Sequence, residues 1–217
     1  MSKKRLCTLT ALLTFVSAGA NASSTDVSLT GMITPTACIP TLSAGGRVDF
    51  GDIKIADLPI EPGMPNHSLL PQRSLTLQVS CGAPTALALV ATGNRRDSSS
   101  TGDPWSFGLG NAPSGDTIGH YTAGWVGSAV TLDNLPAETL YSADRGATWE
   151  RLSAALLEHL GDSPNVLLGF ATRGQATPTP AQLLTLGLAV NGWIRNDVEH
   201  IDQALMDGSL TVEVRYL

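Results

Sequence analysis

Basic residues, cysteines and long apolar runs are all scarce in this chain. Its 217 residues include thirteen lysines and arginines against nineteen aspartates and glutamates, a formal net charge of −6. The sequence holds no basic stripe or run, which argues against nucleic-acid binding. After position 22, no apolar run reaches about 18 residues without a charge or a turn-forming residue, so we expect no membrane span there.

The first 22 residues have the pattern of an export signal. Residues 3–5 (KKR) are basic, residues 6–18 form an apolar run too short for a membrane span, and residues 20–22 (ANA) resemble a cleavage site. We therefore expect residues 1–22 to be removed during Sec-dependent export. Residues 23–217 would then form one domain of a bacterial envelope or secreted protein.

The cysteine content predicts a disulfide. Cys7 falls inside the expected signal, which leaves Cys38 and Cys81. A pair of cysteines in an oxidising compartment favours a disulfide over a metal site, because the chain has no C-x-x-C motif and no H-x-x-x-H spacing. We expect no bound metal and no cofactor.

Turn-forming residues separate short runs of alternating apolar residues along most of the chain. This rhythm predicts an all-β sandwich or barrel. Helical spacing of leucines over residues 149–160, and a capped pattern over residues 197–208, add one or two short helices. Residues 93–127 are rich in Gly, Ser and Asp, and we expect an extended loop region there. The expected strands lie at 27–33, 48–53, 75–81, 86–90, 166–171, 183–194 and 210–216.

Three aromatic residues, Trp105, Tyr121 and Trp125, fall inside this expected loop region. They have two interpretations. Aromatic side chains can anchor a long loop to the core, or they can form an exposed surface that stacks on sugar rings. The sequence leaves both open.

Residues 142–149 (SADRGATW) match the S-x-D-x-G-x-T-W pattern of the Asp-box, which is best known from sialidase-like β-propellers. The pattern residues are Ser142, Asp144, Gly146, Thr148 and Trp149. A carboxylate at the third position can accept backbone N–H groups across the turn, and the glycine can supply a positive φ. The motif occurs once, and the chain is too short for a propeller. We therefore expect a braced turn without a catalytic role.

Several blocks of the chain resemble chaperone–usher pilins. Residues 23–38 (SSTDVSLTGMITPTAC) combine alternating apolar residues, a glycine and a cysteine seven positions later, and residues 208–217 (GSLTVEVRYL) alternate with period two. More particularly, the chain resembles an uncharacterised family of exported fimbria-like proteins that carry one Asp-box. The blocks are TPTACIPTLSAGGRVDFGDI (34–53), LTLQVSCGAPTALAL (75–89), FGLG (107–110), IGHY (118–121) and YSADRGATW (141–149).

The resemblance implies an incomplete immunoglobulin-like sandwich, of the pilin type, that lacks its last strand. A periplasmic pilus chaperone, and later another fimbrial subunit delivered through the usher, would supply this strand by donor-strand complementation. The candidates for donating a strand to a neighbouring subunit are Val27, Leu29, Gly31 and Ile33. The candidates for pairing with the chaperone are Leu210, Val212, Val214, Tyr216 and Leu217.

The function expected from the sequence is therefore that of a non-enzymatic, structural or adhesive subunit of a surface fimbria. Only residues 23–26 precede Val27 after signal removal, so the sequence leaves open whether the N-terminal segment can donate a strand. One alternative is a self-sufficient secreted sandwich that binds a host or surface glycan. A sialidase-like glycoside hydrolase is a weaker alternative.

Overall fold

The computed structural model describes residues 27–30, 37–125, 129–152, 158–161, 163, 165–199, 201 and 204–217. The chain divides into two units, Met1–Thr34 and Pro35–Leu217. In the first unit, residues 27–30 have no regular secondary structure, and the side chains of Val27 and Leu29 are 82% and 91% exposed. The expected export signal and two donor candidates, Gly31 and Ile33, lie outside the described residues.

The second unit is built from strands, which confirms the predicted all-β class. Three short 3₁₀ helices are described in full, Ser43–Gly46, Ile55–Asp57 and Arg96–Ser98, and Ala129 and Ile201 also have 3₁₀ conformation. None of the described helices has the length and apolar character needed to cross a membrane. The strands are β1 (Cys38–Leu42), β2 (Ile60–Glu61), β3 (Met64–Leu69), β4 (Arg73–Thr85), β5 (Leu87–Gly93), β6 (Phe107–Gly108), β7 (Gly119–Trp125), β8 (Val130–Leu132), β9 (Leu135–Ser142), β10 (Glu150–Arg151), β11 (Glu158–His159), β12 (Leu167–Thr172), β13 (Ala181–Arg195) and β14 (Leu210–Tyr216).

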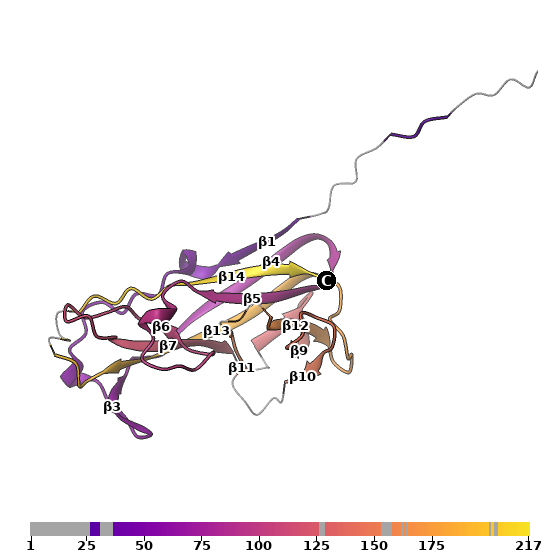
Figure 1. Ribbon diagram of the computed structural model, residues 1–217. Coiled ribbons are helices and arrows are strands. Elements are labelled where there is room, and N and C mark those ends of the chain that lie inside the picture. Colours follow the sequence, from indigo (N-terminus) through magenta and orange to yellow (C-terminus); the bar gives the residue numbers. More distant parts are fainter. Residues whose placement is uncertain are drawn as a thin grey trace, which may run out of the picture. The chain divides into compact units, whose positions relative to one another are not determined.

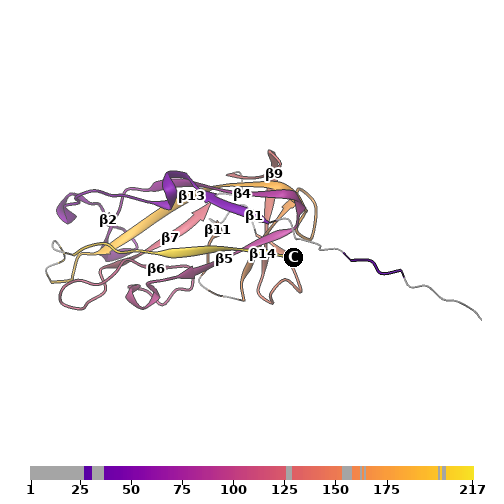
Figure 2. The same cartoon turned by 90° about the horizontal axis from the view of Figure 1, so that it is seen from above.

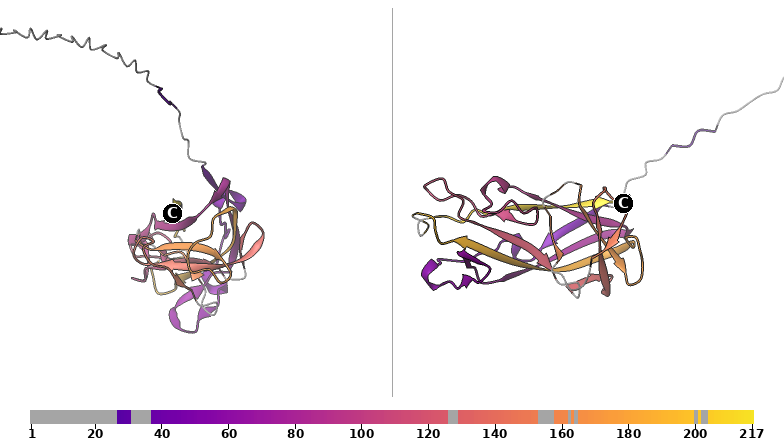
Figure 3. Two further views of the ribbon diagram at one scale, coloured as in Figure 1. Left: turned by 90° about the vertical axis from the view of Figure 1, so that its right-hand side faces the viewer. Right: turned by 60° about the horizontal axis from the view of Figure 1, so that its bottom comes forward.

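These strands form a sandwich whose two layers are joined through β8 and β9. Strands β1, β4, β13 and β7 belong to one layer, and β9, β12, β5 and β14 belong to the other. The hydrogen-bonded path runs β1-β4-β13-β8-β9-β12-β5-β14. Figures 1 and 2 show β1 beside β4, and β14 beside β5. Figure 3 shows β14, in yellow, running to the C-terminus. The two ends of the path are therefore the first and the last strand of the unit.

The two longest strands, β4 and β13, supply much of the core. They pair in an antiparallel ladder, and the side chains of each alternate between buried and more exposed positions. Successive side chains of a strand point to opposite faces, so the apolar set on one face is removed from water together. This confirms the strands expected at 75–81 and 183–194. The buried members are Leu77, Val79, Cys81, Ala181, Leu184, Leu186, Leu188, Val190, Gly192 and Ile194.

The helices expected from leucine spacing and capping are wrong where the structure describes them. Within 149–160, Glu150–Arg151 and Glu158–His159 are strands that pair with β9 and β7. Residues 153–157 lie outside the described part. Residues 204–209, at the end of the second expected helix, have no regular secondary structure. Strand pairing and burial of Leu160 outweigh the weak helical preference of the sequence.

The loop region expected over residues 93–127 contains a core strand. All seven residues of β7, Gly119–Trp125, are buried, and the strand pairs with β13. Small residues make this possible: a Cβ atom at Gly119 would collide with the Trp193 carbonyl oxygen. Close packing between neighbouring backbones, rather than loop flexibility, therefore explains the glycines here. The remainder of the region consists of short elements and turns.

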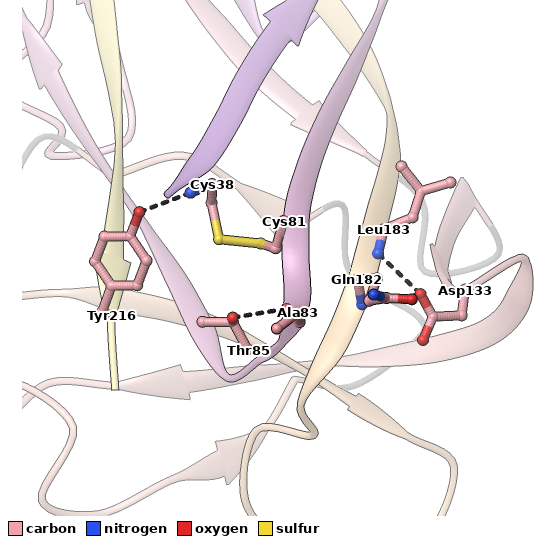
Figure 4. Close-up of a disulfide and its surroundings, with 8 residues drawn as sticks. All are labelled: Cys38, Cys81, Ala83, Thr85, Asp133, Gln182, Leu183 and Tyr216. Carbon is pink, nitrogen blue, oxygen red and sulfur yellow. Dashed lines mark hydrogen bonds between the residues drawn. A yellow bond between two sulfur atoms is a disulfide. The ribbon is translucent and has the colours of Figure 1, made fainter. Parts of the chain in front are cut away.

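The predicted disulfide is confirmed. Cys38 in β1 and Cys81 in β4 lie directly opposite each other in the ladder, with their Cα atoms 4.0 Å apart and their sulfurs bonded (Figure 4). The bond attaches a five-residue strand, which pairs with one neighbour among the described strands, to the longest ladder of the core. The position of β1 therefore depends on a covalent link as well as on backbone hydrogen bonds.

Replacing both cysteines by alanine should lower the free energy of unfolding by about 4 kcal/mol, because the unfolded chain loses the constraint of a closed loop. Urea denaturation followed by circular dichroism measures the change. Wild-type protein that has been reduced and alkylated should unfold at the same urea concentration as the double variant. A double variant as stable as the oxidised wild type would contradict the structural role of the bond.

Candidate functional site

The outer edge of β14 has no partner among the described strands. β14 pairs with β5 on one side, and the Leu217 N–H donates to the Ala86 carbonyl just beyond the ladder. In an antiparallel pair, alternate residues direct both backbone groups to the partner. The backbone N–H and C=O groups of four residues therefore point away from β5: Leu210, Val212, Val214 and Tyr216.

The outer edge of β1 faces the same gap from the other side. β1 pairs with β4, and the Cys38 N–H points away from that ladder, since it donates to the Tyr216 hydroxyl at 2.8 Å. Pro40 lies two residues further along β1, so its backbone nitrogen points in the same direction, away from β4. Proline has no N–H, so it fits a strand position whose nitrogen faces away from the ladder. The described part of the chain thus leaves two strand edges facing each other without a shared ladder.

An apolar groove lies between these two edges. It encloses about 420 Å³, and it is walled by β1 and the segment after it, by β14 and the segment before it, and by β4 and β13 behind. A second cavity of about 440 Å³ shares Val48, Phe50 and Met206 with the first, so the two lie side by side. The apolar residues that form the groove wall include Leu42, Phe50, Leu77, Leu188, Leu210 and Val212.

The segment after β1 explains one discrepancy between sequence and structure. Residues 48–53 were expected to form a strand, and their side chains do alternate, with Val48 and Phe50 turned towards the groove and Asp49 exposed. The structure nevertheless places these residues outside every described strand. The segment therefore has the side-chain pattern of a strand but no ladder partner, and it lies against the groove.

Tyr216 spans the groove at the disulfide end. Its side chain projects from β14 towards β1, and its hydroxyl accepts the Cys38 N–H (Figure 4). Tyr216 is 55% exposed, and Leu217 beside it is also exposed. The other predicted pairing residues, Leu210, Val212 and Val214, are half-buried and pack against the core. The structure thus places Leu210 and Val212 on one wall of the groove, with Val214 in the same phase of β14, whereas the Leu217 side chain lies near Gly146 of the 142–149 turn.

The exposed aromatic surface considered for sugar binding is not present. Trp125 is 0% exposed, its indole N–H donates to the Thr139 hydroxyl, and its ring lies 6.4 Å from that of Phe170. Tyr121 is 8% exposed, and burial raises the pKa of its hydroxyl. Trp105 is half-buried and packs beside Tyr141. Because β7 is a core strand, its aromatics anchor the fold, and the interpretation as a ligand surface is wrong for Tyr121 and Trp125.

The turn over residues 142–149 is braced by its own side chains. Asp144 accepts hydrogen bonds from the Thr148 hydroxyl at 2.6 Å, the Thr148 N–H at 2.9 Å and the Ser142 hydroxyl at 2.8 Å. Gly146 has a φ of +93°, and Trp149 packs against buried residues beneath the turn. The two Thr148 hydrogen bonds and the Ser142 hydrogen bond lower the pKa of Asp144 to about 2. The carboxylate is therefore fully engaged in holding the turn.

Comparisons with known proteins agree with a family-level resemblance. A family model described as "Protein of unknown function (DUF1120)" matches residues 27–106, which include β1, β4, β5 and the disulfide. Two relatives come from Escherichia coli (strain K12). "Protein GltF" is 24% identical, with 98% of this chain and 96% of that protein aligned. "Uncharacterized protein YhcF" is 25% identical, with 89% and 90% aligned. The chain is thus similar to these two proteins over nearly their whole length.

An Asp144→Asn variant should unfold at a lower temperature than the wild type at pH 7, because the charged acceptor of three hydrogen bonds is lost. The pKa of Asp144 is lower in the folded chain than in the unfolded chain, so its ionised carboxylate stabilises the fold at pH values above 3.8. This stabilisation is lost as the pH falls from 3.8 towards 2. The difference between wild type and variant should therefore shrink between these two pH values. Thermal unfolding measures it, with Asp52→Asn as the control for an exposed carboxylate outside the turn. A difference that does not depend on pH would contradict this assignment.

Proposed function

We propose that the protein is an exported, non-enzymatic subunit of the pilin type, and that its groove receives a β-strand from a partner chain. The observation that carries the proposal is the pair of open strand edges, on β1 and β14, on either side of an apolar groove. An added strand would restore a continuous sheet between them. The sandwich would then be completed in trans rather than by the described part of its own chain.

The chemistry of the groove favours a peptide strand over a small molecule. Backbone N–H and C=O groups repeat along the outer edge of β14, and a partner backbone satisfies such groups in series. The inward side chains of Leu210, Val212 and Val214 alternate along β14. An occupant with apolar residues at every second position would place them in the groove and bury them against Leu77 and Leu188.

The chain itself contains a segment of this pattern. Val27 and Leu29 alternate with the polar residues Ser28 and Thr30 before β1, and Gly31 and Ile33 continue the same phase. We propose this segment, presented by a second subunit, as one donor and a periplasmic pilus chaperone as an earlier one. The usher and other fimbrial subunits are the corresponding assembly partners. Export through the N-terminal signal and final location in a surface fimbria are parts of the same proposal.

The two alternative functions gain no support from the geometry. The glycan-binding alternative depended on exposed aromatics, and two of the three are buried. The glycoside hydrolase alternative depended on the turn at 142–149, where the carboxylate of Asp144 is occupied by three hydrogen bonds within the turn. We therefore keep the strand-receiving subunit as the single proposed function.

The proposal predicts that a donor strand fused to the C-terminus will stabilise the protein. The variant carries VSLTGMI after Leu217, joined by a short flexible turn so that the strand can fold back beside β14. Burial of its apolar side chains should raise the midpoint of thermal unfolding by on the order of 5 °C or more. A fused segment of the same composition, shuffled so that the apolar residues no longer alternate, should give no rise.

Two matched substitutions test whether the stabilisation by the fused strand arises in the groove. In the fused protein, Val212→Glu puts a charge on the groove wall and should abolish the stabilisation, whereas Thr211→Glu, on the exposed face of β14, should preserve it. Equal stabilisation by the ordered and shuffled segments, or equal effects of the two substitutions, would contradict a strand-receiving groove.

A further inference from the structure

One hydrogen bond joins the two strand edges that face the groove. The Tyr216 hydroxyl accepts the Cys38 N–H at 2.8 Å, although 178 positions separate these residues in the sequence (Figure 4). Each strand is also held from its other side: the disulfide fixes Cys38 to β4, and the ladder with β5 holds β14. The contact therefore lies between two fixed walls, at the disulfide end of the groove.

The enclosed volume of the groove ends before this contact. Of the residues that line the groove, Pro40 on β1 and Val212 on β14 lie nearest to the disulfide end. Cys38, Val214 and Tyr216 lie further along the same two strands, outside the lining. The hydrogen bond between Tyr216 and Cys38 thus closes the groove at this end rather than lining it.

The β1 edge has few N–H groups to offer to the groove. Cys38, Pro40 and Leu42 share one phase, with their backbone groups directed away from β4. Tyr216 engages the Cys38 N–H, and proline has no N–H. Among these three residues, the N–H that remains for a partner strand is that of Leu42, at the end of β1 away from the disulfide.

The β14 edge offers a full set of backbone groups up to the same point. Leu210, Val212 and Val214 each direct an N–H and a C=O away from β5, so a partner strand opposite them can form its hydrogen bonds in pairs. Beyond Val214 the partner strand would meet the Tyr216 side chain. A partner carbonyl that reached this end of β1 would find no donor unless Tyr216 released the Cys38 N–H.

Release of this hydrogen bond requires no change in the backbone of β14. Tyr216 pairs with Leu87, and the following Leu217 N–H donates to the Ala86 carbonyl, so the backbone is held on both sides of the tyrosine side chain. The Tyr216 side chain is more than half exposed, and rotation about its side-chain bonds carries the hydroxyl away from β1. A side-chain rotation is therefore sufficient to open this end of the groove.

We propose, on the basis of the strand-receiving function above, that Tyr216 determines how far the bound strand extends. The strand pairs with β14 from Leu210 to Val214 and stops there, because the Tyr216 hydroxyl holds the next N–H donor on β1. The groove thus selects a strand whose apolar positions are in register with Leu210, Val212 and Val214. Without the Tyr216 hydroxyl, the groove accepts a strand that continues to the disulfide end.

The fused protein that carries VSLTGMI after Leu217 tests this role, because one substitution should act differently with and without the strand. In the protein without the fused strand, Tyr216→Phe loses the hydrogen bond and should lower the midpoint of thermal unfolding by about 2–4 °C. In the fused protein, the substitution frees the Cys38 N–H for the strand and should leave the midpoint unchanged or raise it. The control Tyr141→Phe, on β9 outside the groove lining, should change the midpoint by the same amount in both proteins.

Amide hydrogen exchange at Cys38 is a second readout, which a purely structural tyrosine would not change in this way. The Cys38 N–H should exchange slowly in the wild type, faster in Tyr216→Phe, and slowly again in the fused Tyr216→Phe protein. Equal changes of the unfolding midpoint with and without the strand, or rapid Cys38 exchange in the fused variant, would overturn the inference while the strand still stabilises the protein. If the ordered strand stabilised neither protein more than the shuffled one, the strand-receiving function would fail, and this inference with it.

Discussion

The outer edges of β1 and β14, which have no partner among the described strands, are the constraint on which the rest of this structure depends. Each strand is held on one side by a long ladder, and each faces the groove with its other side. An open strand edge beside apolar side chains is an aggregation hazard in an isolated protein. The two edges are therefore protected from aggregation only while they are covered. A strand from another chain would cover both at once.

The groove owes its shape to features far apart in the sequence. The disulfide fixes β1 to β4, and pairing with β5 fixes β14 in the opposite layer. The β4–β13 ladder then forms the floor between them. The Tyr216 hydroxyl and the Cys38 N–H join the two walls at one end. A strand that enters the groove must compete with Tyr216 for the Cys38 N–H. This hydrogen bond therefore limits how far a partner strand can pair along β1 towards the disulfide.

Period-two alternation and the cysteine pair allowed the main strands, the disulfide and the C-terminal wall to be predicted, because these signals are local. The helix expected at 149–160 failed because leucine spacing is a weak signal beside strand pairing in the folded chain. Gly119 in β7 was taken as a loop residue, although it permits close packing against the β13 backbone. The same expectation of a loop left open whether Tyr121 and Trp125 were core anchors or a ligand surface, and the structure buries both. The hydrogen bonds from His67 and His120 to Ser100 depend on two separate ladders, β3–β13 and β7–β13, and left no local signal.

Amide hydrogen exchange along β14 tests the central claim most directly. In the isolated protein, the N–H groups of Thr211, Glu213 and Arg215 face β5 and should exchange slowly, whereas those of Val212 and Val214 should exchange rapidly. A bound partner strand should slow the second set and leave the first unchanged. Equal protection of both sets in the isolated chain would show that the edge is already covered, and it would contradict the account.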